Sequence, residues 1–159
     1  MLLERLYDEG LAQAAYLVGC EETKTAIIVD PGRHTHRFIE AAKHRTMHIE
    51  AVTETHIHAD FLSGALELAR HTGAELLASG EGGDDWQYRF DARRLHHDDV
   101  IEVGTVRLRV RHTPGHTPEH IAFIVTDTVV SDEPVGMLSG DFIFVGDVGR
   151  PDLLERAAG

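Results

Sequence analysis

Apolar and polar positions along the first half of the chain follow two different periods. Runs rich in aliphatic and β-branched residues predict strands, and apolar side chains at helical spacing predict helices. Strands are expected at residues 14–19, 25–30, 49–53 and 74–79. Helices are expected at residues 36–45 and 63–72, with Ser63 placed to cap the second helix. The first two strands are separated by a short polar stretch and predict a hairpin, and the strand–helix–strand rhythm that follows indicates an α/β layered domain.

The second half of the chain is mostly β in pattern. Strands are expected at residues 100–103, 106–110, 121–126 and 138–144. Residues 80–94 interrupt this rhythm with two adjacent glycines and with the aromatic residues Trp86, Tyr88 and Phe90. That segment is either a surface loop whose aromatic side chains pack onto the domain or a flap near a functional site.

The 159 residues, 42% of them hydrophobic, are expected to form one domain, 1–159. A net charge of −12 and a pI near 5.3 argue against nucleic acid or an anionic membrane as partner. The single cysteine, Cys20, excludes an internal disulfide and fits a reducing compartment. We interpret Cys20 as a small apolar residue near a turn. Because neither a secretory signal nor a membrane-spanning run is recognised, a cytoplasmic protein is expected.

Residues 55–61 (Thr-His-Ile-His-Ala-Asp-Phe) bring two imidazoles and a carboxylate together directly after an expected strand. Alternate side chains of an extended segment share a face, so His56, His58 and Asp60 are expected to point the same way. Imidazole suits zinc, iron, copper or nickel, and a carboxylate adds a hard oxygen donor. A solvated, histidine-rich loop is the alternative. Asp30, at the end of an earlier strand, is either a carboxylate close to such a metal or a turn-forming residue.

Two later segments strengthen the interpretation as a metal site. Residues 112–120 (His-Thr-Pro-Gly-His-Thr-Pro-Glu-His) predict a rigid turn between strands, which favours His116 as a preorganised ligand. His112 and His120 flank His116, and each is either a residue that supports a metal ligand or a plain surface residue. In the third segment, Asp141 follows a glycine within a very apolar stretch. Because a buried carboxylate is costly unless it is paired or metal-bound, Asp141 is also expected to bind the metal.

The motifs at residues 54–64, 112–120 and 140–152, in this order, resemble those of the metallo-β-lactamase superfamily of αββα sandwiches. Their details are similar to the persulfide dioxygenase (sulfur dioxygenase) branch. They are most similar to the metallo-β-lactamase domain of bacterial proteins that carry fused rhodanese domains. The resemblance covers most of the chain and implies an α/β fold of that type.

The resemblance implies one ferrous iron, Fe(II), per chain, bound by His56, His116 and Asp141. Two histidines and one carboxylate leave three octahedral positions open, as in non-haem Fe(II) oxygenases. A small thiol persulfide and O₂ are then expected to react at the metal and to give sulfite and the free thiol. His58 and Asp60 are expected to orient ligands or bound water during catalysis. Zinc remains an alternative metal.

Two features depart from the superfamily pattern. Dinuclear zinc hydrolases such as glyoxalase II carry a histidine where this chain has Phe61, and a phenyl ring cannot bind a metal, so a mononuclear centre is expected. The chain also ends soon after Asp141, so the sandwich is expected to be truncated in its C-terminal half. The apolar run 142–145 would then need covering, for which a homo-oligomer is one expectation. Arg150 and Asp152 are expected to form an ion pair that locks their loop.

Two alternatives to the persulfide dioxygenase are kept. A zinc-dependent, glyoxalase II-like enzyme would hydrolyse a thioester with a metal-bound hydroxide, and Phe61 argues only against its two-metal version. A truncated, non-catalytic module would serve binding or assembly, although the intact set of ligands disfavours it. The sequence identifies neither the thiol that carries the persulfide nor a rhodanese partner, fused or separate.

Overall fold

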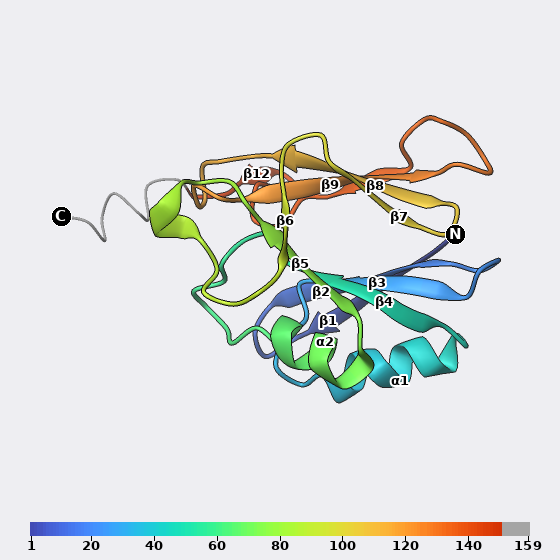
Figure 1. Ribbon diagram of the computed structural model, residues 1–159. Helices are drawn as coiled ribbons and strands as arrows, with labels where there is room; N and C mark the ends of the chain where they lie inside the picture. The colour runs from blue at the N-terminus through green and yellow to red at the C-terminus, as the bar shows by residue number, and fades with distance from the viewer. Residues whose placement is uncertain (151–159) are drawn as a thin grey trace.

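The computed structural model describes residues 1–150 (Figure 1). The helices are α1 (His36–His44), α2 (Ala65–Thr72) and a short 3₁₀ helix, η1 (Asp84–Trp86). The first six strands are β1 (Leu2–Asp8), β2 (Gln13–Cys20), β3 (Thr25–Val29), β4 (His48–Thr53), β5 (Glu75–Ser79) and β6 (Arg93–Leu95). The remaining strands are β7 (Val100–Val103), β8 (Val106–His112), β9 (Ile121–Asp127), β10 (Gly136–Leu138), β11 (Ile143–Phe144) and β12 (Asp147–Val148). Asp152, expected to pair with Arg150, lies outside the described residues.

Two sheets face each other. The six-stranded sheet has the order β1-β2-β3-β4-β5-β6, and the four-stranded antiparallel sheet has the order β10-β9-β8-β7. β3, β4 and β5 pair in parallel, and α1 and α2 make the two crossovers between them. Parallel neighbours need such crossovers, whereas β7, β8 and β9 are antiparallel and need only turns or loops. The parallel centre of the first sheet therefore places the C-terminal end of β4 at one end of the sandwich.

Most of the expected elements are confirmed. The predicted hairpin is β2–β3, which pairs from Tyr16 with Val29 to Cys20 with Thr25. The second helix begins at Ala65 rather than at residue 63, but Ser63 Oγ still accepts the Ala65 N–H at 3.0 Å. β1 was not expected, because its apolar side chains do not alternate cleanly with polar ones.

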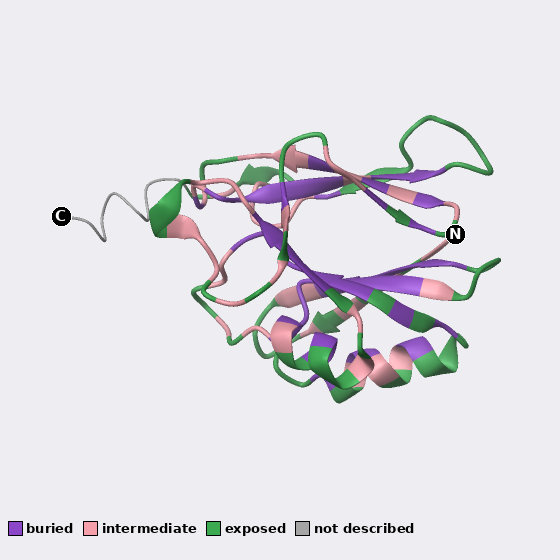
Figure 2. Ribbon diagram, in the orientation of Figure 1, coloured by how far each residue is buried: buried purple, intermediate pink, exposed green. Residues whose placement is uncertain are grey.

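Two apolar cores hold the layers together (Figure 2). One lies between the two sheets and includes Ile27, Leu108 and Phe123. The other lies between the helices and the six-stranded sheet and includes Phe38 and Leu68. Cys20 is buried in the core between the sheets, as expected for a small apolar residue. Burial on both faces explains the nearly continuous apolar run of β3.

Three of the four layers expected of an αββα sandwich are present in residues 1–150. Both α-helices cover the outer face of the six-stranded sheet (Figure 1). The outer face of the four-stranded sheet has no helix in this range, because β7 to β10 are joined by segments that form none. No helix in the described part of the chain is long and apolar enough to cross a membrane.

The expected strand at 138–144 is wrong. β10 ends at Leu138, and Asp141 lies in the turn that connects it to β11. The carboxylate is therefore not buried in an apolar strand, and its side chain remains 42% exposed. Ile143, Phe144 and Val145 are exposed, so this apolar run is uncovered in the single chain. Its coverage by a second copy stays a prediction.

Candidate metal centre

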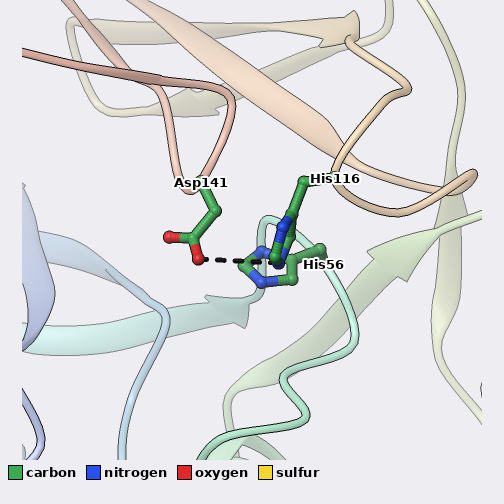
Figure 3. A group of neighbouring side chains, drawn as sticks. All are labelled: His56, His116 and Asp141. Carbon is green, nitrogen blue, oxygen red and sulfur yellow. Dashed lines mark ion pairs between the residues drawn. The ribbon is translucent and has the colours of Figure 1, made fainter. Parts of the chain in front are cut away.

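Three loops bring the three expected ligands together. His56 follows β4, His116 lies between β8 and β9, and Asp141 lies between β10 and β11. One ligand atom of each residue lies within 4.8 Å of the other two, and the side chains point toward one another (Figure 3). His116 Nε2 lies 3.5 Å from Asp141 Oδ2.

The imidazole of His56 is fixed by a chain of hydrogen bonds that begins at Asp30. The Thr55 hydroxyl donates to Asp30 Oδ2 at 2.9 Å, so it accepts a hydrogen bond from His56 Nδ1–H, also at 2.9 Å. This arrangement leaves the lone pair of His56 Nε2 for a metal. Burial, together with the nearby charge of His58, lowers the pKa of His56 to about 2. The ring is therefore neutral, which is the form that binds a metal ion.

His116 is presented by the turn that the sequence predicts. Gly115 adopts a φ of 150°, and its N–H donates to the carbonyl oxygen of Thr117 at 3.3 Å. The Thr113 N–H donates to the carbonyl oxygen of His120 at 2.9 Å and closes the base of the loop. His116 Nδ1 is buried and has no hydrogen-bond partner within the described residues. The ring is thus held by its loop, with Nε2 directed at Asp141.

Asp141 can approach the histidines because Gly140 and Gly149, which pack closely around it, have no side chains. A Cβ on Gly140, whose φ is 50°, would lie 2.5 Å from Thr55 Oγ1 and 2.7 Å from His120 Nε2. A Cβ on Gly149 would collide with the carbonyl oxygen of Asp141. Burial raises the pKa of the Asp141 carboxyl, although the charge of His116 opposes this effect. A bound cation would favour the ionised form that a ligand requires.

His58, expected to act in catalysis, is turned toward Asp30. His58 Nε2 lies 3.2 Å from Asp30 Oδ1, and the His58 side chain is only 7% exposed. Burial lowers the pKa of His58, but the charge and hydrogen bond of Asp30 outweigh burial and raise it above the usual range. Asp60, the other expected catalytic residue, is exposed on the wall of the adjoining cleft.

Asp30 supports the loop that carries His56. Its buried carboxylate accepts the N–H of Thr55 at 2.6 Å as well as the hydroxyl of Thr55 and the ring of His58. Burial raises the pKa of Asp30, but the charge of His58 and these hydrogen bonds outweigh burial and lower it. Asp30 also has a left-handed φ of 54° at the end of β3. The carboxylate thus bonds residues beside the candidate metal site rather than its own backbone, although Asp30 also takes a turn conformation.

The two histidines that flank the His116 turn differ. His120 is fully buried, and its ring stacks on that of His56 with centroids 4.9 Å apart. Burial lowers the pKa of His120 to about 4, so it is neutral. His112 is partly exposed and bonds the carbonyl oxygen of Pro118 at 2.8 Å. His120 supports the ligand His56, whereas His112 braces the loop.

Two buried acids near the site were missed by sequence reasoning. Glu119 is fully buried and accepts the N–H of Ile57 at 2.7 Å. Glu54 is also buried, and burial raises its pKa to about 7. Their closeness to the histidine motifs in sequence was a signal, but an acid next to a motif normally faces solvent.

A cleft of about 530 Å³ adjoins the metal ligands. Its lining includes His58, Asp60, Asp141, Tyr7 and Phe144. Phe61 also lines the cleft, and its ring packs against that of His58 with centroids 4.3 Å apart. The site is thus reached from solvent, and its volume is of the order of small-molecule pockets.

The three donors fit a metal ion. Metal–nitrogen and metal–oxygen bonds are about 2.0–2.2 Å long, so donors within 4.8 Å of one another need only small side-chain movements to share one ion. His56 is neutral with a free Nε2, and two imidazoles with one carboxylate suit iron or zinc. Among the described residues, this is the only group of three or more such donors found.

Comparison with known proteins supports this reading of the fold. The Metallo-beta-lactamase superfamily matches residues 8–158. A crystal structure of a metallo-beta-lactamase from Staphylococcus aureus subsp. aureus COL is 44% identical, with a TM-score of 0.92 over 98% of this chain and 47% of that one. The mitochondrial persulfide dioxygenase ETHE1 of Bos taurus is 26% identical over 99% of this chain and 59% of its own length.

A hydroxyacylglutathione hydrolase of Polaromonas sp. strain JS666 is 32% identical over 94% of this chain and 55% of its own length. The chain spans about half the length of these three relatives. The relatives thus include a dioxygenase and a hydrolase by name. Both resemble this chain to a similar extent, so the comparison does not favour one activity over the other. The match over residues 8–158, the two facing sheets and the converging histidines and aspartate agree: the chain belongs to the metallo-beta-lactamase superfamily.

Proposed function

We propose that this chain carries the centre of a mononuclear non-haem Fe(II) persulfide dioxygenase. The observation that carries the proposal is the set of donors: His56, His116 and Asp141 gather, whereas His58 is bonded to Asp30. Two histidines and one carboxylate form the facial set typical of non-haem Fe(II) oxygenases. The likeness to the Bos taurus persulfide dioxygenase supports the same choice.

Phe61 supports a single metal. By the resemblance to dinuclear hydrolases it takes the place of a histidine that binds a second metal, and its ring packs on His58 beside the cleft. A phenyl ring offers no lone pair to a metal, so this position contributes shape rather than coordination. The exposed Asp60 is left free to bond water or substrate within the cleft.

The proposed reaction converts RSSH, O₂ and H₂O into RSH, sulfite and two protons. The terminal sulfur loses four electrons, which the O₂ molecule accepts. Bound Fe(II) supplies this redox chemistry and offsets the charge of an anionic persulfide in a strongly acidic protein. The chain's own residues hold the metal, fix the ring of His56 through Thr55, and shape the cleft. We also propose a rhodanese-type sulfurtransferase, fused or separate, as the source of the persulfide.

The second candidate is a zinc-dependent thioester hydrolase. The likeness to the Polaromonas hydroxyacylglutathione hydrolase favours it. The same three donors would hold one zinc ion, which lowers the pKa of bound water and generates a nucleophile. Phe61 argues against a two-zinc version and leaves the one-zinc version in place.

Metal content and substrate choice distinguish the candidates. The protein is produced in iron-rich medium, purified without oxygen and analysed for metals, and O₂ uptake is followed with glutathione persulfide. About one iron per chain with persulfide-dependent O₂ uptake, both absent from Asp141→Ala, is the expected result. Zinc alone with hydrolysis of a glutathione thioester would replace the dioxygenase with the hydrolase. If the protein contains no metal and shows neither activity, a non-catalytic module is the remaining candidate.

A further inference from the structure

Two loops carry the candidate histidine ligands, and one side-chain hydrogen bond joins them. We name residues 54–61 the His56 loop and residues 113–120 the His116 loop. Glu119 Oε1, in the His116 loop, accepts the N–H of Ile57, the residue after His56, at 2.7 Å. Within residues 1–150, this is the only hydrogen bond found from a side chain of one of these loops to the other. A backbone hydrogen bond from the Ile121 N–H to the Thr55 carbonyl oxygen, at 2.8 Å, joins the bases of the loops, and the ring of His120 stacks on that of His56.

Glu119 is itself held from a third direction. Its carbonyl oxygen accepts the Ser79 hydroxyl at 2.6 Å, which ties it to the end of β5. A Cβ on Gly82 would lie 2.8 Å from the Cβ and the backbone nitrogen of Glu119, so the chain at Gly82 packs directly on it. The backbone of Glu119 is therefore held in place by β5 and by the chain at Gly82, and its carboxylate in turn fixes the backbone at Ile57.

The carboxylate has no counterion within the described residues. Glu119 Oε2 is buried and unpartnered, and so is the hydroxyl of Tyr88. Burial raises the pKa of the Tyr88 hydroxyl, and the charges of Glu54 and Glu119 raise it further. A buried carboxylate without a counterion is costly.

From this geometry we propose that Glu119 is a positioning residue, which holds the His56 loop and the His116 loop at metal-binding distance. It does not touch the metal and acts through the backbone at Ile57. A side chain at position 119 that is long enough to accept a hydrogen bond from the Ile57 N–H should preserve this function, and a shorter side chain should lose it. The inference rests on the metal site of the proposed function, and it needs no particular reaction there.

The test measures affinity for a metal ion rather than activity. Co(II) is titrated against a chromophoric chelator with wild type, Glu119→Gln, Glu119→Asp and Glu119→Ala. The absorption spectrum of each Co(II) complex and the Tm of each metal-free protein are recorded in parallel. Glu50→Gln is the matched control, because Glu50 is exposed on β4, the strand that leads to the His56 loop.

Glu119→Asp and Glu119→Ala are expected to weaken Co(II) binding by about 10- to 100-fold and to change the Co(II) spectrum. Glu119→Gln keeps an oxygen that reaches the Ile57 N–H and is expected to stay within a few fold of wild type, as is Glu50→Gln. If Glu119→Ala does not fold, Glu119→Asp carries the test, because it retains the charge and loses only reach.

The inference is overturned if the folded Asp or Ala variant binds Co(II) with wild-type affinity and spectrum. It is also overturned if Glu119→Gln is as weak as Glu119→Ala, since charge rather than position would then matter. The Asp141→Ala variant distinguishes a failure of the Glu119 inference from a failure of the proposed metal centre. If Asp141→Ala binds Co(II) as wild type does, the proposed metal centre is wrong whatever Glu119 does.

Discussion

His58 Nε2 lies 3.2 Å from Asp30 Oδ1, and this contact separates two histidines that are equivalent in the motif. His56, two residues earlier, is held by Thr55 with its Nε2 free, whereas His58 is committed to a buried carboxylate. One motif therefore supplies one candidate metal ligand and one residue that is bonded to Asp30. This division favours a centre of two histidines and one aspartate over a centre of three histidines.

Replacement of His58 should weaken metal binding without abolishing it. His58→Gln keeps a donor toward Asp30, and we expect Co(II) or Fe(II) to bind at one equivalent with affinity about 10- to 100-fold lower. His56→Ala removes a ligand and should abolish stoichiometric binding. Isothermal titration of both metal-free variants measures the difference. Equal losses in the two variants would make His58 a ligand and contradict the assignment.

Asp141 should be indispensable for the metal. Asp141→Ala removes the only carboxylate of the donor set, and the two remaining imidazoles hold an ion weakly. Elemental analysis after gel filtration is expected to find wild-type metal content in the control variant Asp132→Ala and almost none in Asp141→Ala. Asp132 is exposed in the loop before β10, which makes it a suitable comparison. Retention of metal by Asp141→Ala would show that other donors form the site.

Gly140 should resist substitution because of its neighbours. In Gly140→Ala, the new methyl group would meet Thr55 Oγ1 and His120 Nε2, and a φ of 50° costs a non-glycine residue about 1 kcal/mol. The turn must then move Asp141 away from the histidines. We expect metal affinity to fall by about tenfold or more.

The matched control for Gly140→Ala is Gly136→Ala. Gly136 lies on β10, has an ordinary φ, and has nothing within 4 Å of an added Cβ. Competition titrations with a chelator should therefore show wild-type affinity for Gly136→Ala. If the two alanine variants bind metal equally well, the close approach of Gly140 does not position Asp141.

The Asp30–His58 pair should make the metal-free protein sensitive to pH. The pKa of Asp30 is lowered from 3.8, so its contribution to the free energy of unfolding is present above about pH 4 and is lost as the pH falls through its folded value. The pKa of His58 is raised from 6.5, so its contribution is present below that pH and is lost as the pH rises through its folded value. The pair therefore acts fully between these two limits.

Asp30→Asn tests this window in the presence of a chelator. Loss of one partner of a buried pair costs about 3 kcal/mol, so urea unfolding at pH 5–6 should show a destabilisation of that order. The difference from wild type should shrink as the pH falls from about 4 through the lowered pKa of Asp30, because the unfolded wild-type chain takes up a proton there before the folded one does. A difference that stays constant from pH 6 to pH 2 would mean that the charge of Asp30 contributes nothing to stability.

The sequence alone was sufficient for much of the fold. Period and turn chemistry predicted the β2–β3 hairpin, both helices and most strands, because each depends on neighbours in the chain. β1 was missed, since Leu3 and Tyr7 stay exposed and blur its alternation. The region of Asp141 was misread as a strand because its apolar residues are exposed in a turn and a hairpin rather than buried.

The sequence by itself predicted the candidate metal ligands: two histidine motifs and an aspartate in a fixed order, which the structure brings together as His56, His116 and Asp141. Only the tertiary structure decided which other residues hold the candidate ligands in place. It joined Asp30 to His58, stacked His120 on His56, and buried Glu119 against Ile57. The Asp30–His58 contact depends on the parallel pairing of β3 with β4, and the contacts of His120 and Glu119 depend on how the two sheets pack. No local pattern of residues records that packing, which is why the ligands could be predicted and their supports could not.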